Sequence, residues 1–115
     1  MRIASVAVAV TLLAASAAAA HHGWSGYDNA HALTIDDVIT HSSDEHPHGH
    51  VRLATPGKTW NITMPPPWRM ERRGLTPEML KPGTKARLVG YPHRTDPHEM
   101  RGEQITIGDT TFELR

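Results

Sequence analysis

The sequence predicts an all-β fold with a small α content, in the form of one small barrel of five to six strands. Apolar and polar residues alternate along most of the candidate strands, as they do where one face of a strand is buried. The first candidate strand is long and changes its apolar phase in the middle, which is typical of a β-bulge. The short helical stretch falls between the third and fourth strands.

A signal peptide is expected over residues 1–20. Arg2 supplies a minimal positive region, residues 3–15 are apolar and uncharged, and residues 18–20 form an alanine cleavage site. The apolar run is too short for a convincing membrane span, so no stable span is expected after cleavage; an uncleaved anchor is the alternative. The chain then divides into a signal peptide at 1–20, an N-terminal arm at 21–32 and a single β-barrel domain at 33–115, and the mature protein is expected to be periplasmic or secreted.

The composition of the mature chain narrows the class of protein. Its 95 residues (115 − 20) are enough for one domain, and the absence of cysteine means that the core alone must stabilise the fold. Removal of Arg2 leaves eleven basic against twelve acidic residues, which excludes the strongly basic surface of a nucleic-acid-binding protein. All nine histidines lie in the mature chain, which is unusual for its length.

The first half of the mature chain predicts an arm and three strands. Turn-forming residues make the arm irregular, and Trp24 and Tyr27 are expected to attach it to the barrel. Residues 33–40 form the first strand, with the bulge expected near Asp36-Asp37, and a polar loop follows. The clearest hairpin spans residues 51–64, where a Pro-Gly turn at 55–58 separates two alternating segments.

The second half predicts a short helix and three further strands. Pro67 is expected to begin a helix over 68–73, which ends at Gly74, and Thr76 is expected to cap the next helical turn. Residues 85–91 form the fourth strand, 92–99 a second polar loop, and 100–107 with 110–114 a final hairpin. The expected core comprises Val51, Leu53, Trp60, Ile62, Leu88, Ile105 and Leu114.

This order of elements suits an OB-like Greek-key barrel, with a two-sheet sandwich as the alternative. In an OB-like barrel the loops between strands one and two and between strands four and five flank the binding face. Here these loops are expected at residues 41–50 and 92–99, and six of the nine histidines fall in them.

The chain resembles a family of small exported bacterial proteins of uncharacterised function. The resemblance implies a periplasmic, β-rich single domain and supplies no activity. The family motif has Asn where this chain has His46, which leaves His48 as the better candidate ligand of the two. The matching segments are His21-His22-Gly23-Trp24, His46-Pro47-His48, Gly57-Lys58-Thr59-Trp60, Arg72-Arg73-Gly74-Leu75 and Gly90-Tyr91-Pro92.

Two histidine clusters are candidate metal ligands. His46, His48 and His50 would share one face of an extended backbone, although a polar turn that happens to contain histidines explains the same spacing. A mature N-terminal His21 would offer its α-amine and its ring to one ion, and His48 or His50 would complete a planar nitrogen set for Cu(II). Cleavage one residue earlier would place His22 third from the free amine, which also favours Cu(II) or Ni(II). Zinc is the main competitor of copper, and His93 in the second loop is a further candidate ligand.

Other functional classes have weaker support. The chain lacks a glycine-rich phosphate loop, a cysteine nucleophile and a nucleophile elbow, so no catalytic residue is assigned and an enzyme is not favoured. A small copper redox enzyme is kept as an alternative, and so is a metal-free module that binds a periplasmic partner protein. Arg69, Arg72 and Arg73 would either hold an anion or form a solvated, partly ion-paired surface.

Overall fold

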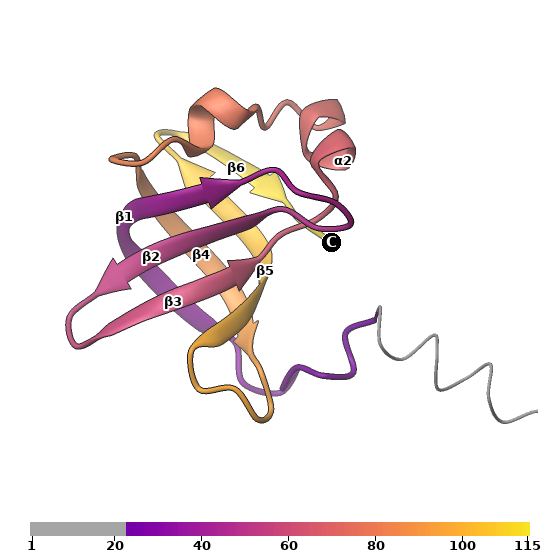
Figure 1. Cartoon of the computed structure of the whole chain (residues 1–115), viewed down its shortest axis with the longest axis vertical. Helices are drawn as coiled ribbons and strands as arrows, with labels where there is room; N and C mark the ends of the chain where they lie inside the picture. Colours follow the sequence, from indigo (N-terminus) through magenta and orange to yellow (C-terminus); the bar gives the residue numbers. More distant parts are fainter. Residues whose placement is uncertain (1–22) are drawn as a thin grey trace, which may run out of the picture.

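The computed structural model describes residues 23–115, so the expected signal peptide, its cleavage site and His21 and His22 lie outside the described residues. An arm leads into six strands, with a helix and a 3-10 helix between the third and fourth of them (Figure 1). The elements are β1 (Leu33–Ser43), β2 (His50–Thr55), β3 (Lys58–Thr63), α2 (Pro67–Arg72), η1 (Pro77–Leu80), β4 (Lys85–Pro92), β5 (Glu99–Ile107) and β6 (Thr110–Glu113).

The first five strands form a closed barrel. The order of hydrogen-bonded neighbours is β3-β2-β1-β4-β5-β6, and all of these pairs are antiparallel. The barrel closes where residues 61–63 of β3 pair in parallel with residues 99–101 of β5. Strand β6 extends the sheet beyond β5 (Figure 1). The prediction of a small OB-like barrel with one short helix is therefore confirmed.

The barrel interior is filled by alternate residues of the strands, as the period of a strand requires. Six of the seven predicted core residues are buried, the exception being Trp60. Trp60 packs against the core from a partly exposed position, with the Lys58 ammonium 4.1 Å from the centre of its ring. The prediction that Trp60 lies in the core was therefore only partly right.

Strand β1 differs from the expectation in two ways. Its bulge lies at Thr40, where the register with β2 shifts, and not at Asp36-Asp37. Ile35 and Ile39 consequently stay in phase and face the core, whereas Val38 is exposed. The strand also runs on to Ser43, so the loop that follows is limited to residues 44–49.

The longer strands correct the expected placement of the histidines. His41 lies in β1 and His50 begins β2, so only four histidines lie in the β1–β2 and β4–β5 loops: His46, His48, His93 and His98. The bulge explains the difference, because the extra residue lets β1 continue past the point where the sequence turns polar.

The segment between β3 and β4 covers one end of the barrel (Figure 1). Pro67 begins α2 as expected, and Gly74 follows it with a φ of 88°. Thr76 occupies the N-cap position of η1 as expected, but its side chain makes no capping hydrogen bond. Met70, Leu75 and Leu80 are buried in the main core cluster and seal this end against water.

Candidate functional site

The N-terminal arm is attached to the ends of β4 and β5. Tyr27 and His93 form an isolated antiparallel bridge, and the amide of Asp28 donates to the carbonyl oxygen of Pro92 at 2.9 Å. The amide of Arg94 donates in turn to the carbonyl oxygen of Gly26, also at 2.9 Å. The arm therefore continues the hydrogen-bonding pattern of the β4 end.

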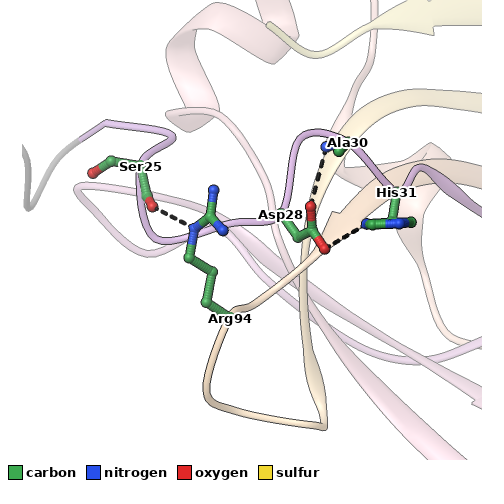
Figure 2. A network of polar contacts seen from close by, with 5 residues as sticks. All are labelled: Ser25, Asp28, Ala30, His31 and Arg94. Carbon is green, nitrogen blue, oxygen red and sulfur yellow. Dashed lines mark hydrogen bonds and ion pairs between the residues drawn. The ribbon is translucent and has the colours of Figure 1, made fainter.

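Side chains reinforce this attachment, as Figure 2 shows. The Nε atom of Arg94 donates a 3.0 Å hydrogen bond to the carbonyl oxygen of Ser25. The Asp28 carboxylate accepts from the amide of Ala30 at 3.1 Å and from His31 Nδ1 at 2.7 Å. The hydrogen bond from His31 is the main cause that lowers the pKa of Asp28. These contacts hold the turn that leads into β1.

Two guanidinium groups lie over the ring of Trp24. The Cζ atom of Arg101 is 4.4 Å from the centre of the indole, and the Cζ atom of Arg115 is 4.5 Å from it. Tyr91 meets the same indole edge to face, with the ring centres 6.0 Å apart. Arg101 also donates from Nη1 to the carbonyl oxygen of Gly23 at 3.2 Å. The backbone at residues 23–24 is therefore fixed to β5 and to the C-terminus.

Tyr27 also attaches the arm to the barrel. Its side chain is buried, and its hydroxyl donates to the carboxylate of Glu99, which also accepts a 3.4 Å hydrogen bond from Thr63. Burial, followed by the hydrogen bond to Glu99, raises the pKa of Tyr27 to about 12. The prediction that Trp24 and Tyr27 attach the arm to the barrel is confirmed.

The histidines of the β1–β2 loop do not share one strand face. His46 is exposed at a bend whose peptide bond to Pro47 is cis, and His48 is partly buried beside the buried Gly49. Only His50 lies in a strand. The condition for a common face, an extended backbone from 46 to 50, is therefore not met.

A different pair of histidines faces one hollow on the outer surface of β1, β2 and β3. His41 pairs with Arg52 and Ser43 pairs with His50, which places His41 and His50 on the same outer face in adjacent strands. They line a shallow hollow of about 310 Å³, together with Ser43, Glu45, Val51, Arg52 and Asn61. From the sequence His41 was expected in a loop, because the bulge that precedes it in β1 leaves no local sequence signal.

His93 has a structural role in the β4–β5 loop. Its Nδ1 atom accepts hydrogen bonds from the amides of Thr95 at 3.2 Å and Asp96 at 3.0 Å, so the lone pair of that nitrogen is already engaged. Its ring also meets Tyr27 edge to face, with the centres 5.2 Å apart. Only the Nε2 atom of His93 remains for a metal ion.

Within residues 23–115, no three His, Asp or Glu side chains converge on a point where they could hold a metal ion. The two remaining histidines of the sequence, His21 and His22, directly precede Gly23.

Comparison with known proteins places the chain in a family. A family model described as a family of unknown function (DUF6152) matches residues 9–101, which is most of the chain, so the chain belongs to that family. Neither the curated proteins nor the solved structures contain a match to the chain. In the described part of the chain, no helix is both long and apolar enough to span a membrane.

Proposed function

We propose that this member of the DUF6152 family is an exported periplasmic protein that binds copper through its mature N-terminal histidine and imidazoles of the β1–β2 segment. The observation that carries the proposal is the attachment at residues 23–24. Arg101 holds the carbonyl oxygen of Gly23 and stacks on Trp24, two to three residues after the expected new N-terminus.

The chemistry requires export and cleavage. Cleavage after Ala20 would free the α-amine of His21, which together with its ring gives two nitrogen donors from one residue. His48 or His50 would supply a third nitrogen, and tetragonal nitrogen ligation suits Cu(II). Cleavage one residue earlier would use His22 instead, as the third residue from the free amine.

The attachment supports the proposal because it reduces the entropy cost of binding. A free terminus must lose backbone freedom when it chelates an ion, and this loss is about 1–2 kcal/mol for each residue ordered. Here residues 23 and 24 are already ordered by contacts with β5 and the C-terminus.

Protein purified from the periplasm provides the test. Its intact mass should correspond to a chain that starts at His21, and it should retain or take up about one equivalent of copper in preference to zinc or nickel. Because imidazoles bind metal only when neutral, affinity should weaken as the pH falls from about 7.5 to 5.5. His48→Ala should weaken binding, whereas His98→Ala, which removes an exposed histidine outside the candidate set, should not.

Two results would contradict the proposal. Retention of residues 1–20 in the exported protein would leave no free amine at His21. Absence of copper, zinc and nickel binding would favour the second candidate, a metal-free module that binds a partner. The hollow lined by His41, His50, Arg52 and Asn61 on the outer face of the barrel is the observation that favours this second candidate.

A further inference from the structure

The short helix α2 carries three arginines beside an exposed indole. Arg69, Arg72 and Arg73 line a shallow hollow of about 370 Å³ together with Trp68, and half of the Trp68 surface is exposed. The Cζ atoms of Arg69 and Arg72 lie 5.6 Å and 5.9 Å from the centre of the Trp68 ring. A guanidinium group that stacks on a ring keeps the N–H donors in its own plane available to an oxyanion.

Within residues 23–115, none of these three arginines forms an ion pair with a carboxylate. The ion pairs of this part of the chain involve other residues. Arg73 donates to the backbone carbonyl oxygen of Glu113 at 2.7 Å, which is a neutral acceptor. Glu71 lines a separate hollow with Met70 and Leu75. Helical neighbours three and four residues apart share a face, so Arg69 faces the same way as Arg72 and Arg73 and Glu71 does not.

The positive charge extends from α2 towards the arm. Arg101, which stacks on Trp24, is within electrostatic reach of both Arg69 and Arg115. Burial lowers the pKa of Arg101, and the positive charges of Arg69 and Arg115 act in the same direction. The positive charge of Arg69 in α2 therefore acts together with those of the two arginines around Trp24. The mature chain as a whole is nearly neutral.

We propose that the arginine face, defined as Trp68, Arg69, Arg72 and Arg73, binds a phosphate-class oxyanion. Arg69 and Arg72 would donate to the phosphate oxygens, and the Trp68 ring would pack against the group that carries the phosphate. Like charges three and four residues apart destabilise a helix, and a bound oxyanion removes this repulsion. The carbonyl end of α2 favours a cation in its last turn, but it does not explain why three converge on one hollow.

Free phosphate and an anionic lipid headgroup present the same chemistry, so the experiment has two arms. Calorimetric titration with inorganic phosphate and with pyrophosphate tests a soluble ligand. Co-sedimentation with phosphatidylglycerol vesicles, against phosphatidylcholine vesicles, tests a lipid headgroup. Both arms use the mature protein at low ionic strength, where charge screening is weak.

Three variants make the result specific to the arginine face. Arg69→Gln with Arg72→Gln should weaken binding about tenfold or more, while Arg69→Lys with Arg72→Lys keeps the charge and should restore part of it. Arg87→Gln removes one positive charge from the exposed surface of β4, where Arg87 pairs with Asp36 at 2.9 Å, and should leave binding unchanged. An unchanged unfolding midpoint shows that each variant is folded.

Binding in either arm that depends on Arg69 and Arg72 supports the proposal, and the arm that responds identifies the source of the phosphate. Absence of binding to phosphate, pyrophosphate and phosphatidylglycerol would overturn it. Binding that the double glutamine variant retains, or that Arg87→Gln weakens equally, would also overturn it, because the charge of the whole protein would then be responsible.

Discussion

Arg101 holds Trp24 against the barrel: its Cζ atom lies 4.4 Å from the centre of the indole, and its Nη1 atom donates to the carbonyl oxygen of Gly23. One side chain of β5 thus contacts both the ring and the backbone of the arm. Because Arg115 stacks on the same ring at 4.5 Å, the C-terminal residue also takes part in this attachment.

Trp24→Ala should release the start of the arm. Two stacked guanidinium contacts are lost, at about 0.5–1 kcal/mol each, so the free energy of unfolding should fall by about 1–2 kcal/mol. Hydrogen exchange should accelerate at the amides of Asp28 and Arg94, which join the arm to β4 and the β4–β5 loop. Exchange at the buried Leu88 provides the control, and unchanged exchange at both arm amides would contradict the assigned role of Trp24.

Tyr27 should make stability depend on pH in the alkaline range. Its pKa is about 12 in the folded protein and 10.0 in the unfolded reference, mainly because burial disfavours the phenolate. The unfolded chain therefore loses this proton first as the pH rises. The contribution is fully present below about pH 10 and is lost as the pH rises through 12.

Urea unfolding between pH 8 and pH 11.5 measures this dependence. Tyr27→Phe removes the titrating group. The free energies of unfolding of wild type and variant should therefore change in parallel below about pH 10, and above it the wild type should lose stability faster. Tyr91 is present in both proteins and cancels in the comparison. Parallel curves over the whole range would show that Tyr27 does not carry a raised pKa.

Gly90→Ala should destabilise the barrel. A Cβ atom at this buried position would overlap the carbonyl oxygen of Arg101 and lie 2.9 Å from the side chain of Met100. Backbone and core must move to accept it, at a cost of about 1–3 kcal/mol. Gly26→Ala is the matched control, because its nearest contact would be an ordinary 3.6 Å from His93. Equal unfolding midpoints for the two variants would refute the steric argument.

Most of the fold was predictable from the sequence, because alternation marks the buried face of each strand and proline and glycine mark the turns. The length of β1 was not predictable, since the bulge at Thr40 depends on pairing with β2 and leaves no local signal. The partial exposure of Trp60 was missed for a related reason: alternation gives the face of a residue but not its distance from the open end of a barrel.

The candidate site was predictable to a smaller extent. The attachment of the arm by Trp24 and Tyr27 followed from the rule that an ordered terminus needs large side chains to hold it. The stacking of Arg101 and Arg115 on Trp24 joins residues 77 and 91 positions apart, 101 − 24 and 115 − 24, and no sequence pattern connects them. The same is true of His41 and His50, which the register of two strands brings to one hollow.

The affinity for Cu(II) of a mature protein with three glycines added before His21 tests the proposed function most directly. The extension keeps every side chain and removes the chelate between the α-amine and the ring of His21. It also leaves no histidine within the first three residues, whereas a single glycine would place His22 third from the new amine, an arrangement that itself favours Cu(II). Measured by competition with a chelator of known strength, it should abolish most of the Cu(II) affinity, as should His21→Ala. Equal affinity of the extended and native termini would contradict binding at the terminus and would leave only loose uptake by the histidines of the loops.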